Sequence, residues 1–122
     1  MTHKEISVKF LTMCITDQVE KAYDLFVHKD FLHHNQYVKN DKLSLLNAMM
    51  EDNQVHKKKK ITILKQIEEN NYVSNYSIVN IDDKTKYMVV HIFRFEDDQI
   101  IEAWDIGEEV IKDSANPIID LN

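Results

Sequence analysis

Apolar residues follow helical spacing over the first part of the chain. The pattern predicts a helix over residues 4–15 and a second over residues 17–27, whose start carries Asp17 and Glu20 in the arrangement of a capping box. A third helix is predicted over residues 41–51, with Asp41 as its N-terminal cap. The side chains expected to face inward are Ile6, Phe10, Met13 and Cys14 on the first helix, Val19, Ala22, Tyr23 and Phe26 on the second, and Leu45, Leu46, Met49 and Met50 on the third.

The hydrophobic period then changes from helical to alternating. Residues 31–38 already leave the helical period and predict a short extended segment. Strands are expected over residues 61–69, 72–81, 86–95 and 99–110, separated by short polar turns. Long strands joined by short turns favour an antiparallel meander, so helices followed by a sheet predict an α+β domain.

The last two predicted strands form a hairpin whose register decides which residues share a face. A two-residue loop at Asp97 and Asp98 would mix charged and apolar residues on one face. A loop longer by one residue places most apolar residues on one face and separates them from the Arg94 and Glu102 pair. It pairs Phe95 with Ile101, Phe93 with Ala103 and His91 with Asp105 on one face, and Arg94 with Glu102 on the other. We therefore expect His91 and Asp105 to share a mainly apolar inner face.

Size and composition indicate one domain over residues 1–122. The chain has 122 residues, 43% of them hydrophobic, which is enough for a core, and it has no linker rich in glycine or proline. No signal-like apolar stretch follows a basic start, and no apolar segment approaches twenty residues. A cytoplasmic protein with no membrane association is the expectation.

Charge and cysteine content limit which partners and which kinds of chemical site the chain can have. A net charge of −6 argues against nucleic acid as a partner, because binding to its backbone requires a positive surface. The basic run 57–60, which follows His56, is expected to be a solvated connection between a helix and a strand. The single Cys14 fits a small buried hydrophobe better than a nucleophile. No His or Cys spacing predicts a metal site.

The chain also resembles a known family. The two short helices, the HHN at residues 33–35 and the run HIFRFEDDQIIEAWD at residues 91–105 resemble the SnoaL-like polyketide cyclases of the nuclear transport factor 2-like superfamily. The resemblance implies three N-terminal helices packed in a cone-shaped, strongly curved mixed or antiparallel sheet, also called cystatin-like. It further implies a deep pocket, no metal or organic cofactor, and a homodimer formed through the sheet.

The resemblance assigns roles to particular residues. It implies that Asp105 is the catalytic acid and base, assisted by His91, and that Asn35 is a polar residue of the pocket. Two positions differ from the family. Val89 stands where the cyclases place a glutamine, two residues before the histidine, and Asp98 stands at the hairpin tip where glycine is common. Aspartate tolerates the left-handed backbone that such a tip requires.

The residues themselves support an acid/base mechanism. A carboxylate on an apolar face loses hydration and becomes a stronger base, so Asp105 could remove a proton next to a substrate carbonyl. The enolate needs a hydrogen-bond donor, for which His91, His34 and Asn35 are the candidates. His33 lies on the opposite strand face from His34 and is expected to face solvent.

Further residues are candidates for contact with a small hydrophobic ligand that contains a carbonyl group. Asn75 and Ser77 alternate with Val73 and Val79, so they line the cavity if that face points inward. Trp104 and the tyrosines Tyr72, Tyr76 and Tyr87 fit sheet packing or dimer contacts. The substrate-binding set is His34, Asn35, Asn75, Ser77, Val89, Phe93 and Trp104.

Two functions remain open at this point. The first is a small cofactor-free enzyme, a cyclase, isomerase or dehydratase, that uses Asp105 as general acid and base. The second is a non-catalytic domain that binds a small ligand or dimerises, in which His91 and Asp105 are a structural pair.

Overall fold

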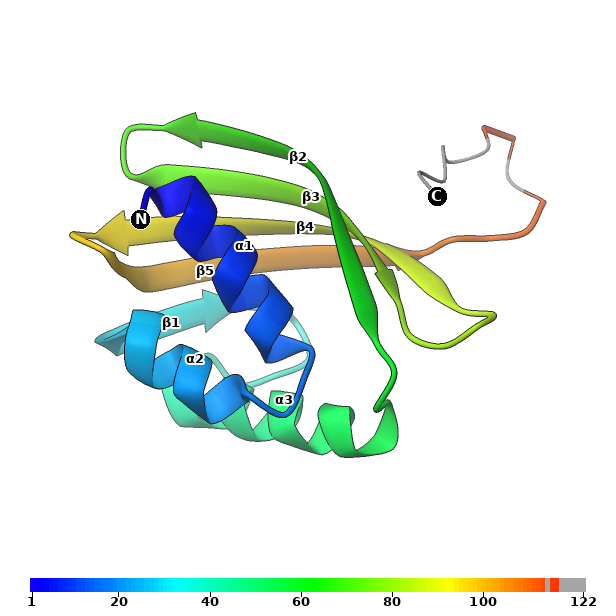
Figure 1. Ribbon diagram of the computed structural model, residues 1–122, viewed down its shortest axis with the longest axis horizontal. Helices are drawn as coiled ribbons and strands as arrows, with labels where there is room; N and C mark the ends of the chain where they lie inside the picture. The colour runs from blue at the N-terminus through cyan, green and yellow to red at the C-terminus, as the bar shows by residue number, and fades with distance from the viewer. Residues whose placement is uncertain (114, 117–122) are drawn as a thin grey trace.

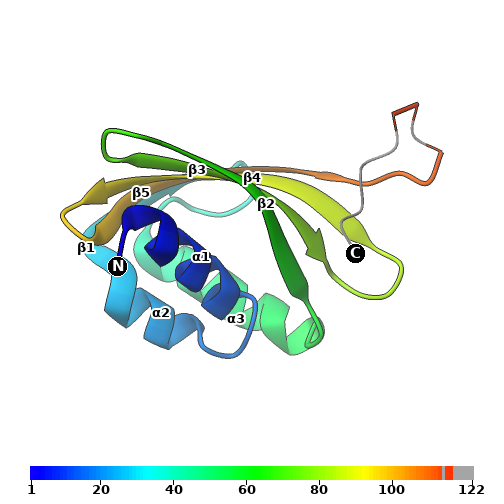
Figure 2. The ribbon, with the colours of Figure 1, turned by 45° about the horizontal axis from the view of Figure 1, so that its top comes forward.

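The computed structural model describes residues 1–113, 115 and 116 and forms helices on one side of a curved sheet. The elements are, in order, α1 (His3–Cys14), α2 (Val19–Phe26), β1 (Val27–His34), α3 (Lys42–Val55), β2 (Lys60–Glu69), β3 (Tyr72–Asn80), β4 (Lys86–Glu96) and β5 (Gln99–Glu109). The five strands lie in the order β1-β5-β4-β3-β2. Figure 2 shows the sheet arching over all three helices, and no helix of the described residues covers its other face. The predicted α+β class is confirmed.

The helix boundaries agree in part with the sequence pattern. α1 begins with a capping box between Thr2 and Glu5 that the pattern did not indicate. The capping box expected from Asp17 and Glu20 is wrong, because α2 begins after Gln18 without a side-chain cap. Asp41 caps α3 as predicted, through Ser44 N at 3.0 Å, but the helix continues to Val55 rather than ending at residue 51.

β1 adds a parallel strand beside the predicted antiparallel meander, which the structure confirms for β2 to β5. It begins at Val27, where the second helix was expected to end, and it pairs in parallel with β5. A parallel partner requires a long crossover connection, and here α3 and the three strands β2 to β4 lie between the two in sequence. The sheet is therefore mixed, with only β2 to β5 forming an antiparallel meander.

The hairpin of β4 and β5 has the predicted register around His91, but a bulge and not a longer loop produces it. Its turn has two residues, since Glu96 pairs with Gln99, and the left-handed backbone falls on Asp97 (φ 54°) rather than on Asp98. The register then shifts by one after Phe95, which lies opposite Ile100 and not Ile101. From Arg94 onward the predicted pairing holds, including His91 opposite Asp105. The extra residue is thus a β-bulge in β5 and not a longer loop.

The register assigns side chains to two faces of the sheet, because directly paired residues point to the same side. Phe93, Ala103 and His33 share one row, and Phe93 and Ala103 are part of the core that packs on the helices. Arg94 and Glu102 share a row on the outer face and are joined by a hydrogen bond of 2.9 Å from Arg94 Nε. Both helical amphipathicity and strand alternation thus direct apolar groups into one layer. No helix in the described part of the chain is long and apolar enough to cross a membrane.

Candidate active site in the cavity beneath the sheet

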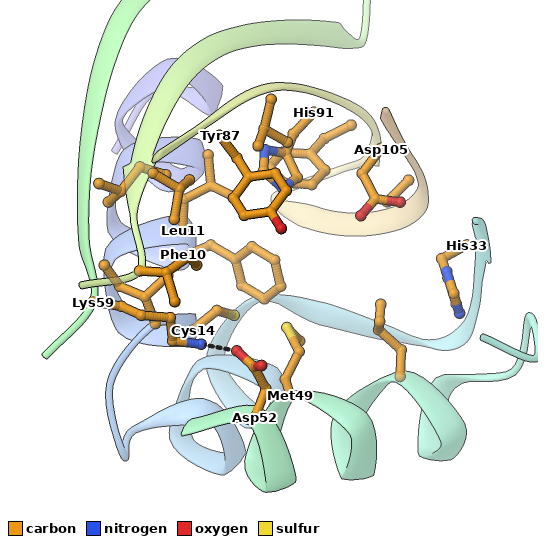
Figure 3. A pocket seen from close by; sticks show the side chains of 18 of the residues that line it. Phe10, Leu11, Cys14, His33, Met49, Asp52, Lys59, Tyr87, His91 and Asp105 are labelled. Carbon is orange, nitrogen blue, oxygen red and sulfur yellow. Dashed lines mark hydrogen bonds and ion pairs between the residues drawn. The ribbon is translucent and has the colours of Figure 1, made fainter. Parts of the chain in front are cut away.

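A cavity of about 250 Å³ lies between the inner face of the sheet and helices α1 and α3 (Figure 3). Its walls are mostly apolar, with a few ionisable groups among them. The lining residues include Phe10, Leu11, Cys14, Phe31, Leu45, Met49, Ile61, Val79, Val89, Phe93 and Ala103, together with the polar His33, Asp52, Lys59, Tyr87, His91 and Asp105. This mixture of apolar wall and few polar groups is typical of small-molecule sites.

Asp105 is held at the wall of this cavity by the segment that follows β1. Asn35 Nδ2 donates a hydrogen bond of 2.9 Å to Asp105 Oδ1. Tyr37 N donates to Asn35 Oδ1 at 2.7 Å, which fixes the amide so that its NH₂ group faces the carboxylate. Asn35 and Asp105 are seventy residues apart in sequence, and the parallel pairing of β1 with β5 brings them together.

His91 faces Asp105 as a cross-strand pair, and both line the cavity. Burial lowers the pKa of His91, an effect that the nearby Asp105 carboxylate only partly offsets, so the imidazole is neutral near pH 7. His91 Nδ1 is buried and has no hydrogen-bond partner among the residues that the structure describes. A neutral imidazole beside a carboxylate can donate a hydrogen bond to a ligand oxygen, a role that does not require a charged ring.

The adjacent histidines His33 and His34 of β1 point to the opposite faces from those expected. His33 is buried and lines the cavity, and its Nε2 donates to the carbonyl of Lys39 at 2.8 Å. His34 points to the outer face, where Nε2 bonds Glu102 Oε2 at 2.7 Å. The reason is the register with β5, in which His33 pairs with the inward Ala103 and His34 with the outward Trp104. The expectations of a pocket His34 and an exposed His33 are therefore wrong.

The other predicted ligand contacts divide between the cavity and its surroundings. Val89 and Phe93 line the cavity as expected. Trp104 does not, because it lies on the outer face and stacks on His34 with 5.0 Å between ring centroids. Asn75 and Ser77 point inward as predicted but are fully buried outside the cavity wall.

Asn75 lies behind the site. It shares a row with His91 and Asp105, accepts a hydrogen bond from Gln66 Nε2 at 2.8 Å, and donates to the backbone carbonyl of His91 at 3.3 Å. It can support the strand that carries His91 without touching a ligand.

Besides His33, three polar groups of the cavity were not among the candidates from the sequence, namely Asp52, Lys59 and Tyr87. Tyr87 was expected in sheet packing or in a dimer contact, yet Figure 3 shows its hydroxyl directed toward the cavity. Lys59 belongs to the run expected to be solvated, yet its side chain is only 7% exposed and pairs with Asp52. Strand alternation could have indicated Lys59, because it lies two residues before the inward Ile61. No three His, Cys, Asp or Glu side chains of the described residues are placed to share a metal ion.

Comparisons with protein-family models and with curated protein sequences give no match. Solved structures match in fold. AclR, a candidate hydroxylase from Streptomyces galilaeus, has a TM-score of 0.74 and 12% identity over 87% of this chain and 88% of its own. A nuclear transport factor 2-like protein of unknown function from Cytophaga hutchinsonii has a TM-score of 0.72 and 16% identity over 88% and 91%.

A candidate SnoaL-like polyketide cyclase from Jannaschia has a TM-score of 0.71 and 10% identity, covering 87% of this chain and 85% of its own. At such identities the likeness establishes the fold, and the fold expected from the sequence resemblance is confirmed. The same fold carries proteins described as a hydroxylase and as cyclases, so the reaction has to be argued from the site.

Proposed function

Since the chain has a SnoaL-like, nuclear transport factor 2-like fold with a carboxylate in the wall of its cavity, we propose that it is a cofactor-independent acid/base enzyme. Its substrate is a small hydrophobic compound with a carbonyl group, and its reaction is a cyclisation, an isomerisation or a dehydration. Asp105 is the general base and acid, His91 assists it, and Val89 and Phe93 contact the substrate.

The observation that carries the proposal is the setting of Asp105. The carboxylate lies at a largely apolar cavity, and Asn35 holds one of its oxygens at 2.9 Å. The other carboxylate oxygen, Oδ2, accepts no hydrogen bond from the residues that the structure describes. A base needs this combination of fixed orientation and a lone pair that is free for the substrate.

The proposed chemistry starts with proton transfer. Asp105 takes the proton from the carbon next to the carbonyl; that C–H bond breaks, and its electron pair moves through the new C=C bond onto the carbonyl oxygen. In a substrate with a neighbouring C=C bond the enolate is a dienolate, and return of the proton to its γ-carbon gives an isomer. Attack of the enolate on a second carbonyl forms the C–C bond of a ring, and the resulting alkoxide takes the proton back from the Asp105 carboxylic acid. Alternatively, expulsion of a β-hydroxyl, protonated by the Asp105 carboxylic acid, gives a dehydrated product and water. All three outcomes share the first step.

The enolate oxygen requires a hydrogen-bond donor in a site that excludes water. His91 is neutral and lines the cavity, so one ring N–H is suited to this role. The hydroxyl of Tyr87 also points into the cavity (Figure 3) and is a second donor of the right kind. Phe10 and Phe93, in edge-to-face contact at 5.5 Å, shield this region from solvent.

The shared first step allows a test that does not depend on the product. Ketones, lactones and polycyclic carbonyl compounds are screened for thermal stabilisation of the protein, because a ligand that binds the folded state raises its apparent stability. Compounds that bind are then incubated with the protein in D₂O, and the loss of the α-proton signal is followed by ¹H NMR. We expect exchange that D105N slows by about 10²-fold or more, while the surface variant D24N keeps the wild-type rate; Asp24 is exposed.

The same experiment separates the enzyme from a binding protein. If ligands stabilise the protein but their α-protons exchange no faster than in buffer, the cavity is a non-catalytic ligand site and Asp105 is a structural residue. If D105N exchanges the proton as fast as wild type, Asp105 is not the base.

We also propose a homodimer formed through the outer face of the sheet. Strand register places Ile67, Tyr72, Ile106 and Trp104 on this face, and the first three are 62%, 41% and 75% exposed. Exposed apolar side chains on the uncovered face of a sheet fit a second copy of the same face. Sedimentation of wild type and I106K tests it. A wild-type monomer at micromolar concentration would contradict it.

A further inference from the structure

The basic run at residues 57–60 sends one of its four lysines into the cavity. The side chains of Lys57, Lys58 and Lys60 belong to exposed residues, whereas that of Lys59 is only 7% exposed and lines the cavity wall. The cause is strand alternation extended by one residue, since Lys59 directly precedes β2 and faces the same inward side as Ile61, the second residue of β2. A lysine needed only for solubility would point outward, as its neighbours do.

Lys59 lies at the end of the cavity opposite Asp105. Figure 3 shows Lys59, Asp52 and Cys14 together on one side of the view, with His91, Asp105 and His33 on the other. Apolar groups lie between the two ends, among them Phe10 and Met49. The cavity is thus polar at both ends and apolar in the middle. We call the group of Lys59 and Asp52 the lysine end, and the group of Asp105, His91 and His33 the aspartate end.

The charges at the lysine end favour an anion. The ammonium of Lys59 carries three N–H donors, and Asp52 accepts one of them. The side chain of Asp52 is 50% exposed, so water can solvate its carboxylate when a second anion approaches Lys59. Lys57, Lys58 and Lys60 add positive charge around this end, in a protein with a net charge of −6. Local positive charge of this kind attracts anionic ligands to a cleft.

From this arrangement we infer that Lys59 is the binding site for a ligand carboxylate, so that the substrate class is an amphipathic keto acid. Its carboxylate contacts Lys59, its apolar part lies against Phe10 and Met49, and its carbonyl group reaches Asp105. The inference rests on the proposed function for the position of the carbonyl. The carboxylate contact itself requires only that the cavity binds ligands.

Matched pairs of compounds test the contact. The probes are 3-benzoylpropionate, 4-benzoylbutyrate and 5-benzoylvalerate, each beside its primary amide, which keeps the ketone and the aryl group but removes the charge. Binding is measured by calorimetry at low salt. We expect at least one acid to bind wild type about tenfold or more tightly than its amide, because hydrogen bonds to charged groups are the stronger ones.

Variants assign that preference to one residue. K59M keeps the aliphatic stem and removes the charge, and it should reduce the preference for the acid below about threefold while leaving the amide's affinity unchanged. K58M removes the same charge from an exposed neighbour in the same run and should keep the preference. D52N removes the competing carboxylate and should strengthen binding of the acid, so the inference can be tested even if K59M does not fold.

Each result has one interpretation. The inference is supported if K59M loses the preference for the acid while K58M keeps it, or if D52N binds the acid more tightly than wild type does. Equal binding of acid and amide to wild type, or a preference that survives K59M, overturns it and leaves the proposed function standing if either compound binds. If no acid, amide or other carbonyl compound binds, the proposed function fails first and the inference fails with it.

Discussion

The amide of Asn53 joins α3 to the end of α1, and its removal should lower the stability of the whole helical layer. Asn53 is 7% exposed, and its Nδ2 donates to the carbonyls of Cys14 at 2.9 Å and Thr16 at 2.6 Å. The carbonyls at the C-terminal end of a helix have no partner within the helix, so this one side chain satisfies the buried carbonyl of Cys14, the last residue of α1, and also the carbonyl of Thr16 in the turn that follows.

The expected loss of stability follows from the two hydrogen bonds that Asn53 Nδ2 donates. A net contribution of about 1 kcal/mol for each hydrogen bond predicts that N53A lowers the free energy of unfolding by about 2 kcal/mol. N53D has the same shape but places an anionic acceptor against two carbonyl oxygens, so its loss at pH 7 should exceed that of N53A and reach about 3 kcal/mol or more. The matched variant N47D lies on the exposed side of the same helix and should change stability by less than about 0.5 kcal/mol.

The assay is equilibrium unfolding in urea at pH 7 and pH 4.5, with comparison of midpoints and slopes. In N53D the carbonyl oxygens raise the pKa of the introduced carboxyl in the folded state. The group therefore stabilises the fold at low pH, and this contribution is lost as pH rises through the folded pKa. The deficit of N53D should shrink between pH 7 and pH 4.5. If N53D lies within about 0.5 kcal/mol of wild type at pH 7, the assigned hydrogen bonds do not hold the helices together.

Three further predictions concern single side chains and are checked by urea unfolding. Burial raises the pKa of Glu102, but the hydrogen bonds and positive charges of His34 and Arg94 together outweigh burial, so the net pKa is lowered. The stabilising effect of Glu102 is therefore present above an unfolded pKa of about 4.3 and is lost as pH falls through the lower folded value. E102Q should therefore cost up to about 1 kcal/mol at pH 7 and nothing at pH 2. Burial lowers the pKa of His91, so wild type should lose stability as pH falls below about 6.5, and H91Q should flatten this part of the profile. T2A removes the capping box of α1 and should lower the free energy of unfolding by about 1 kcal/mol. Because the lost hydrogen bond is made by an uncharged hydroxyl, this decrease should not depend on salt concentration.

Local patterns in the sequence were sufficient to predict most helices and strands and, within the site, the pairing of His91 with Asp105. The helical period located α1 and α3, and alternation located β2 to β5. The sorting of polar from apolar residues identified the pairing of His91 with Asp105, because a slip by one residue would have reversed every side chain in the hairpin. The register survived an incorrect loop length, since the bulge in β5 supplies the same one-residue shift.

The tertiary structure decided everything that depends on contacts distant in sequence. His33 and His34 are adjacent, and only the pairing of β1 with β5 determines that His33 faces the cavity. The hydrogen bond from Asn35 to Asp105 likewise follows from that parallel pairing. Lys59 appears in the sequence as one of four equivalent lysines, and the start of β2 alone sets it apart by directing its side chain inward. A sequence specifies the period of an element, but the face that meets the core is fixed only when the element finds its partner, because alternation is symmetric until one side is buried.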